Sequence, residues 1–249
     1  MSGHSKWSTI KRQKGAADAK RGQLFTKLAR EIAVAAREGL PDPESNFRLR
    51  LAVDRARTAN MPKDNIERAI ERAAGGSNTE NFSEVFYEGY GPGGTAIMIQ
   101  TMTDNRNRTV GEVRAVLTRA GGTLGEAGSV GWMFDHVGLI ELEANGGDPD
   151  DLALVAIDAG ASDIQIDEGS VAVFTDVQDL HKVGQVLKEA GYDLASTQLT
   201  MRPKTMLTPE PDAAVKTIRL VERLEDLDDV QEVFTNLDVT DDVLALATS

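Results

Sequence analysis

The chain has 249 residues, a formal net charge of −13 and no cysteine, which excludes disulfides, thiolate zinc sites and cysteine nucleophiles. No apolar run approaches the ~20 residues of a membrane-spanning helix, so we expect no membrane association. The absence of cysteine, and of an apolar segment within the first 30 residues, favours a cytoplasmic protein over a secreted one.

The charge is distributed unevenly along the chain. Residues 1–30 carry eight Lys/Arg and one acid, Asp18, which gives +7. Residues 31–75 are neutral, and residues 76–249 hold 11 basic and 31 acidic residues, which gives −20. Such asymmetry indicates a segment that binds a polyanion, joined to an acidic body. The alternative is a basic helix face that is simply solvated.

The first 75 residues show the periodicity of helices. Apolar positions such as Leu24, Leu28 and Ile32 predict a helix over 16–37. Further helices are predicted over 46–59 and from Pro62, taken as the first helical position, to the glycines at 75 and 76. These helices predict a basic helical domain over 1–77, from which the residues before Ala16 project as an arm.

Cations of this domain are candidates for contact with nucleic-acid phosphates. Arg48 and Arg55 lie seven residues apart and flank the apolar stripe of the second helix. Trp7 is either a packing residue or stacks on a base. The candidate residues here are Lys6, Trp7, Lys11, Arg12, Lys14, Lys20, Arg21, Lys27, Arg48 and Arg55.

The rest of the chain alternates strands and helices. A first group of strand, helix and strand is predicted over 95–101, 107–120 and 129–134. A β-α-β-β-α-β series follows over 137–143, 149–159, 163–167, 170–174, 177–190 and 194–200. This order is typical of a ferredoxin-like domain. A last helix over 212–224 and a strand over 231–236 complete the series.

One helix and one strand cannot form a domain, so we expect the last pair to join the first group. The fold class is therefore α+β, with a helical amino-terminal domain and two ferredoxin-like domains, the second inserted in the first. The predicted domains are 1–77, 78–135 plus 204–249, and the inserted 136–203.

The sequence contains no constellation of residues that indicates catalysis. Gly89–Gly94 matches G-x-G-x-x-G, but a strand rather than a helix follows it, so we interpret it as a turn. The three histidines, His4, His136 and His181, are scattered, and the acidic runs at 148–151 and 225–229 are typical of helix caps and solvated loops. We expect no enzyme, no cofactor, no metal and no small-molecule substrate.

Arg106 and Arg108 are further candidates for binding an anion. Asp104 or Asn105 is expected to cap the helix that follows, which places both arginines in its first turn. The helix dipole disfavours cations there, which suggests that an anion binds beside them. The alternative is a salt bridge to Glu112 or to another neighbouring acid.

Long motifs of this chain resemble the YebC/PmpR family. They are GHSKW (3–7), AADAKRGQLFTKLAREI (16–32), RLRLAVDRA (48–56), NMPKDNIERAI (60–70), YEGYGPGG (87–94) and DNRNRT (104–109). The resemblance implies a three-domain cytoplasmic bacterial protein, described as a probable DNA-binding transcriptional regulator, with no established catalytic residues. A mitochondrial relative in this family is described as a translational activator, and the family has also been linked to the ribosome. Two local departures are the absence of histidine at 11–14 and Phe47 where the family has proline.

The sequence therefore favours a nucleic-acid-binding regulator of gene expression, with DNA as the expected partner. A ribosome-associated translation factor that binds rRNA or tRNA is the first alternative, because no recognition helix is evident and the acidic body would be repelled by DNA. A protein-binding adaptor is the second.

Overall fold

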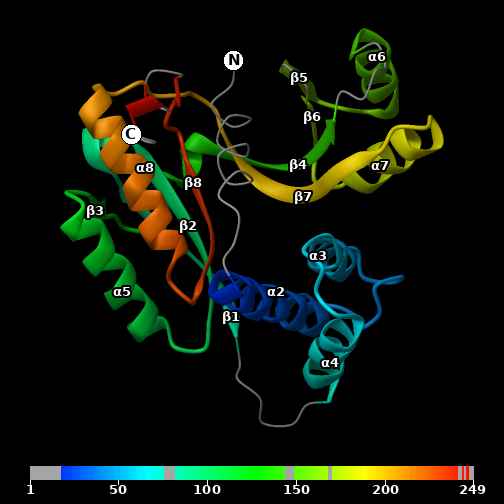
Figure 1. Cartoon of the computed structure of the whole chain (residues 1–249), viewed down its shortest axis with the longest axis horizontal. Helices are drawn as coiled ribbons and strands as arrows, with labels where there is room; N and C mark the ends of the chain where they lie inside the picture. The colour runs from blue at the N-terminus through cyan, green and yellow to red at the C-terminus, as the bar shows by residue number, and fades with distance from the viewer. Residues whose placement is uncertain are drawn as a thin grey trace. The chain divides into compact units, whose positions relative to one another are not determined.

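The computed structural model describes residues 18–75, 82–143, 149–167, 170–240, 243 and 245–246 (Figure 1). The described residues divide into two compact units. One unit comprises Asp135–Arg202, and the other comprises the chain before and after it. The predicted arm, before residue 16, lies outside the described residues.

Three helices form the amino-terminal part of the larger unit: α2 (Asp18–Glu38), α3 (Phe47–Thr58) and α4 (Lys63–Ala74). The predicted helices agree with these bounds to within a few residues. Ile32 of α2, Leu49 of α3 and Ile66 of α4 are buried in one apolar core, together with alanines of all three helices. Pro62 was predicted to be the first residue of α4. Its backbone is extended, with ψ of 138°, so Pro62 precedes the helix, which begins at Lys63.

The buried side chain of Asn46 connects α2 to α3. Its Oδ1 accepts a hydrogen bond from the Leu49 amide at 3.0 Å and thereby caps α3. Its Nδ2 donates to the carbonyl oxygens of Ala35 and Leu40, both at 2.8 Å. One amide side chain thus satisfies backbone groups at the end of one helix and at the start of the next.

The larger unit also contains a four-stranded sheet in the order β3-β1-β2-β8. Its strands are β1 (Ser83–Tyr90), β2 (Ala96–Thr103), β3 (Thr123–Leu124) and β8 (Val230–Thr235). Because β1 is antiparallel to both β2 and β3, it separates the two parallel strands of a β-α-β unit. Helices α5 (Arg106–Arg119) and α8 (Pro211–Glu225) share one apolar core with this sheet (Figure 1). Strand β8 pairs with β2, which confirms that the second ferredoxin-like domain is inserted in the first.

The predicted strands of this sheet differ from the observed ones at three places. Strands β1 and β3 were not predicted, and the segment 129–134, which was predicted as a strand, contains a short 3-10 helix, η2 (Gly131–Met133). The reason for this last difference is a side chain of β1: the Glu88 carboxylate accepts hydrogen bonds from the amides of Gly128, Val130 and Gly131, each at 2.7 Å. These amides cannot therefore pair with a neighbouring strand.

The glycine-rich segment at 89–94 connects two antiparallel strands. Its second half is a single 3-10 turn, η1 (Pro92–Gly94), in which Gly93 has a φ of +71°. A Cβ atom at Gly93 would lie 2.7 Å from the Cβ of Pro209, so glycine is required there for space as well as for conformation. The segment lacks the helix amino terminus that a dinucleotide fingerprint needs.

The smaller unit has the predicted β-α-β-β-α-β order. Its elements are β4 (Phe134–Glu143), α6 (Pro149–Ala159), β5 (Asp163–Asp167), β6 (Ser170–Thr175), α7 (Leu180–Glu189) and β7 (Leu194–Pro203). The sheet order is β5-β6-β4-β7, and β6 is antiparallel to both β4 and β5. Helix α7 begins three residues later than predicted, because residues 177–179 form a turn.

Replacing Asn46 with alanine is expected to lower the free energy of unfolding by about 2–3 kcal/mol, because the cap is lost and two carbonyl groups lose their donor. Urea denaturation measures this change. Ser45→Ala, at the neighbouring exposed position, is the matched control and should change stability by less than about 0.5 kcal/mol. Equal effects of the two substitutions would contradict the role assigned to Asn46.

Candidate nucleic-acid interface

Five of the ten candidate residues of the amino-terminal domain cannot be placed. Lys6, Trp7, Lys11, Arg12 and Lys14 lie outside the described residues. Lys20 belongs to the first turn of α2, but its side chain is also outside the described part. Arg21 follows it in α2 and has an exposed side chain.

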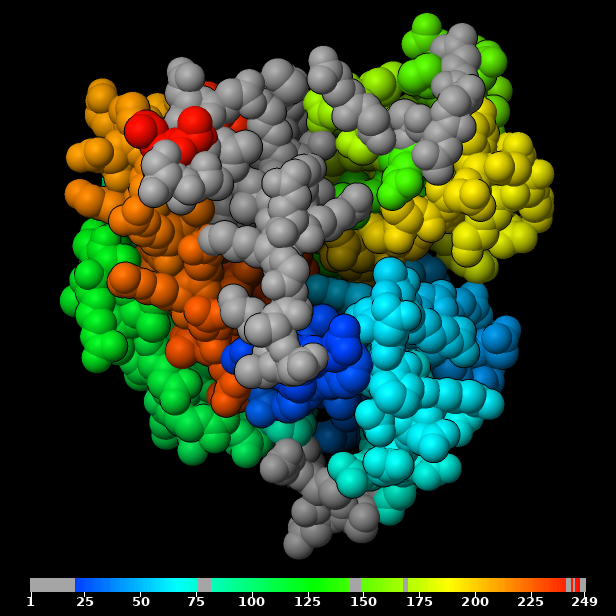
Figure 2. Space-filling view, in the orientation of Figure 1, coloured from blue at the N-terminus to red at the C-terminus, as the bar shows by residue number. Residues whose placement is uncertain are grey.

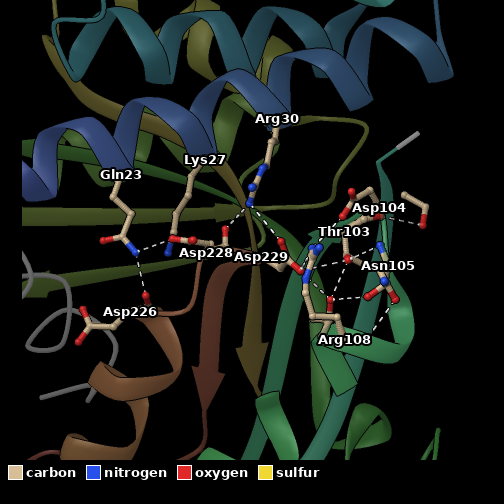
Figure 3. Close-up of polar contacts among 12 residues, drawn as sticks. Gln23, Lys27, Arg30, Thr103, Asp104, Asn105, Arg108, Asp226, Asp228 and Asp229 are labelled. Atoms are coloured by element: carbon tan, nitrogen blue, oxygen red, sulfur yellow. Dashed lines mark hydrogen bonds and ion pairs between the residues drawn. The ribbon is translucent and has the colours of Figure 1, made fainter. Parts of the chain in front are cut away.

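Side chains of α2 contact the loop that joins α8 to β8 (Figure 3). Lys27 Nζ donates to the carbonyl oxygen of Glu225 at 2.5 Å, and burial lowers the pKa of this lysine. Gln23 Nε2 donates to the carbonyl oxygen of Asp226 at 2.8 Å and to Asp228 Oδ1 at 3.1 Å. These bonds attach the helical part of the unit to its sheet.

Asp229 lies at the centre of this contact and is only 2% exposed. Its Oδ2 accepts hydrogen bonds from Thr103 Oγ1 at 3.1 Å, Arg108 Nη2 at 2.6 Å and Thr109 Oγ1 at 2.7 Å. Its Oδ1 lies 3.3 Å from Arg30 Nη1 (Figure 3). Burial raises the pKa of Asp229, but the hydrogen bonds from Arg108 and Thr109 outweigh that effect and hold the pKa below its ordinary value.

The two arginines at the start of α5 have different surroundings. Asn105 Oδ1 caps the helix by accepting from the Arg108 amide at 3.1 Å, as predicted. Arg108 forms ion pairs with Asp104 at 2.7 Å and Asp229 at 2.6 Å, and these hydrogen bonds raise its pKa. The anion beside Arg108 is therefore a carboxylate of the chain itself, although neither partner is Glu112. Arg106 is exposed, and its Nη2 lies 3.5 Å from Ser83 Oγ.

The two predicted arginines of α3 also have acidic partners within the unit. Arg48 pairs with Glu38 of α2 and with Glu84 of β1, the latter at 2.9 Å. Arg55 pairs with Glu31 of α2 at 3.4 Å and with Glu232 of β8 at 3.7 Å. The charge of Glu31 is the main reason why the pKa of Arg55 is raised. Both arginines thus connect the helices to the sheet.

A groove of about 790 Å³ runs between α2 and α4. The two helices are in direct contact and appear in blue and cyan in Figure 2. The described residues that line the groove are Phe25, Thr26, Ala29, Arg30, Ala33, Arg37, Met61, Asn65, Arg68, Ala69, Arg72, Ala73 and Phe82. Four of them are arginine and none is acidic, in a chain whose net charge is −13.

The groove has an apolar floor and a basic rim. Ala29 and Ala33 of α2 face Ala69 and Ala73 of α4 across it, and these small side chains leave the space open. The arginines at 37, 68 and 72 are exposed, whereas the Arg30 guanidinium lies 4.9 Å from the centre of the Phe82 ring.

Sequence reasoning did not single out Arg37, Arg68 or Arg72. On α4 the arginines recur at i and i+4, each directly followed by an alanine, and this spacing places them along one edge of the helix. Ala69 is buried in the core of the helices and Ala73 packs against that core, and both also line the groove. Alanines four residues apart on both α2 and α4 are the sequence feature that accompanies this surface.

Neither a metal cluster nor a membrane segment is found among the described residues. No group of three His, Cys, Asp or Glu side chains in the described ranges could hold a metal ion. Likewise, within the described part of the chain, no helix has both the length and the hydropathy needed to cross a bilayer.

Comparison with known proteins gives matches along most of the chain. The sequence model of the TACO1/YebC N-terminal domain matches residues 5–76, and that of the TACO1/YebC second and third domain matches residues 82–237. Curated relatives named "Probable transcriptional regulatory protein" include one from Chloroflexus aurantiacus, 53% identical with 98% of both chains covered. Another, from Roseiflexus castenholzii, is 54% identical and covers 98% of this chain and 97% of the relative.

A solved structure also resembles the fold described above. It is the crystal structure of a conserved hypothetical protein from Aquifex aeolicus, with 45% sequence identity and a TM-score of 0.82. The match covers 90% of this chain and 93% of the other.

Replacing Asp229 with asparagine is expected to lower the free energy of unfolding near pH 7 by about 3 kcal/mol, because two arginines lose their shared buried carboxylate. The pKa of Asp229 in the folded state is below the ordinary value of 3.8, so its stabilising effect is present above that pH and is lost as the pH falls through the folded pKa. The difference between the wild type and the variant should therefore shrink below about pH 4.

Urea denaturation over a series of pH values measures this difference. Asp226→Asn, at an exposed position of the same loop, is the control and should cost less than about 0.5 kcal/mol. A stability difference for Asp229→Asn that stays constant down to about pH 3 would contradict the assignment.

Proposed function

Because the chain belongs to the TACO1/YebC family, as its motifs predicted, we propose that it is a nucleic-acid-binding regulator of gene expression that acts on DNA. The observation that carries this proposal is the charge of residues 1–30, which hold eight Lys/Arg and one acid. The groove between α2 and α4, which four arginines and no described acid line, adds support in the helical part that follows. The names of the relatives, which are those of regulatory proteins, support the same role in transcription. The proposed location is the cytoplasm.

The cations of the larger unit divide into two groups in this proposal. Lys27, Arg48, Arg55 and Arg108 bind acceptors of the same chain, so they position the helices and add positive potential nearby. The proposed phosphate ligands are the amino-terminal residues Lys6, Lys11, Arg12, Lys14, Lys20 and Arg21, together with Arg106, and Trp7 is proposed to stack on a base.

Replacing Lys11, Arg12, Lys14, Lys20 and Arg21 with alanine is expected to weaken binding to nucleic acid by at least about tenfold and to leave the fold intact. For the wild type, an arm that contacts ~5 phosphates predicts a slope near −4 in a plot of log affinity against log salt. Fluorescence anisotropy at several salt concentrations measures both quantities, and the variant should lose most of the slope.

The matched control removes the same charge elsewhere. Lys182, Lys188, Lys216, Arg219 and Arg223 are exposed residues of α7 and α8, and their replacement with alanine also lowers the net charge by five. This control should keep the slope of the wild type. Binding that is absent, or insensitive to salt, would contradict the proposal and favour a protein-binding adaptor.

A role on the ribosome is the second candidate, and the charge of −20 over residues 76–249 favours it. An acidic body is repelled by flanking DNA, whereas on a ribosome it can lie beside basic proteins. Sedimentation of a cell lysate distinguishes the two. We expect the protein in the nucleoid fraction, and co-migration with ribosomes that high salt abolishes would assign it to rRNA or tRNA instead.

A further inference from the structure

We propose that the groove between α2 and α4 binds a single-stranded segment of nucleic acid, with its phosphates at Arg68 and Arg72 and an unpaired base on the apolar floor. This inference rests on the proposed function and adds to it a site and the form of the partner. The ligand chemistry, a flexible phosphodiester strand with exposed bases, is common to single-stranded DNA and RNA.

The first argument is the state of the arginines. Among the described residues, Arg72 has no hydrogen-bond or ion-pair partner, and the one recorded contact of the Arg68 guanidinium is a long one, at 3.5 Å from Asn65 Oδ1. In contrast, Arg48, Arg55 and Arg108 each have two carboxylate partners. Since Arg68 and Arg72 lie on successive turns of α4, neighbouring phosphates of one strand can contact both side chains.

The second argument is the shape and chemistry of the hollow. A volume of about 790 Å³ falls within the range of roughly 300–1,000 Å³ that is typical of sites for small ligands. Its walls include Phe25 and Phe82, and four alanines form its floor. An aromatic base with its phosphate presents a flat apolar face together with negative charge, which matches an apolar floor with a basic rim.

The third argument concerns duplex nucleic acid. A protein that reads a duplex inserts a protruding helix or ribbon into the major groove. The arginines of α4 line the rim of the protein groove, so this edge of the helix does not protrude as an element that enters the DNA major groove would. Bases that can lie in a hollow are the unstacked ones of single strands, loops and bulges.

Arg30 has a different role from Arg68 and Arg72. Its guanidinium is held by Asp228 and Asp229 on one side and lies over the Phe82 ring on the other. Its charge is already partnered, so we infer that Arg30 fixes the Phe82 wall of the groove and does not bind phosphate itself.

The test measures binding of the full chain to labelled 12-nucleotide probes by fluorescence anisotropy. The probes are one single-stranded DNA, the single-stranded RNA of the same sequence, and the corresponding DNA duplex. Arg68→Ala/Arg72→Ala should weaken binding to the single strands at least tenfold and reduce the salt slope by about 1.4, while affinity for the duplex changes less than threefold. If the affinity for one of the two single strands falls more than that for the other, that strand, DNA or RNA, is the preferred ligand of the groove.

The matched control is Arg219→Ala/Arg223→Ala, which removes two exposed arginines at the same i, i+4 spacing from α8. It should leave all affinities within twofold of the wild type. An equal loss of single-strand affinity in this control would show that net charge alone is responsible, and it would overturn the proposal that the groove is the site.

A second variant separates the base from the phosphates. Ala73→Leu keeps every charge but fills the floor of the groove, so it should weaken single-strand binding several-fold and leave the salt slope unchanged. Thermal unfolding checks that each variant is folded. Unchanged single-strand affinity in both the double-arginine variant and Ala73→Leu would overturn the inference, as would an equal loss for the duplex.

Failure of this inference can be distinguished from failure of the proposed function. If the five amino-terminal substitutions abolish binding and the groove variants do not, the groove is not the site and the function stands. If the wild type binds none of the three probes, both proposals are wrong.

Discussion

The buried carboxylate of Asp229 is the interaction on which the arrangement of the larger unit depends. It accepts hydrogen bonds from side chains at the start of α5 and forms an ion pair with Arg30 of α2, so three distant segments meet at one charge. A carboxylate that is 2% exposed is costly to bury unless it is fully partnered. The backbone that carries Asp229 is therefore fixed relative to both helices, and the contacts of Gln23 and Lys27 lie beside it.

This arrangement changes the meaning of the uneven charge along the chain. An excess of lysine and arginine in one segment has the same composition whether the cations bind phosphates or carboxylates of the same molecule. In this unit, acids of the sheet and of the α8–β8 loop are the partners of cations from α2, α3 and α5. Part of the −20 of residues 76–249 thus holds the helices in place. Only geometry separates these paired cations from Arg68 and Arg72, which have no carboxylate partner among the described residues.

The sequence predicted the elements whose signal is local and could not predict contacts between distant residues. Helix periodicity and the β-α-β-β-α-β order were sufficient for most bounds and for the insertion of one domain in the other. Strands β1 and β3 were missed. The segment 129–134 was wrongly predicted as a strand, because the Glu88 carboxylate binds amides about 40 residues away. Asp229, one of the two acidic partners of Arg108, lies 121 residues further along the chain. The acidic run 225–229 that contains it was therefore interpreted as a helix cap or a solvated loop. The groove needs two helices side by side, which no single window of sequence contains.

Arg30 connects the groove physically to the Asp229 cluster. It lines the groove and also forms an ion pair with Asp229, whose second arginine partner, Arg108, comes from α5. With two arginines on it, Asp229 contributes little negative potential to the groove, even though it is the acid bound to one of the groove's own residues. The same ion pairs that hold α2 against the sheet therefore leave Arg68 and Arg72 available to an external anion.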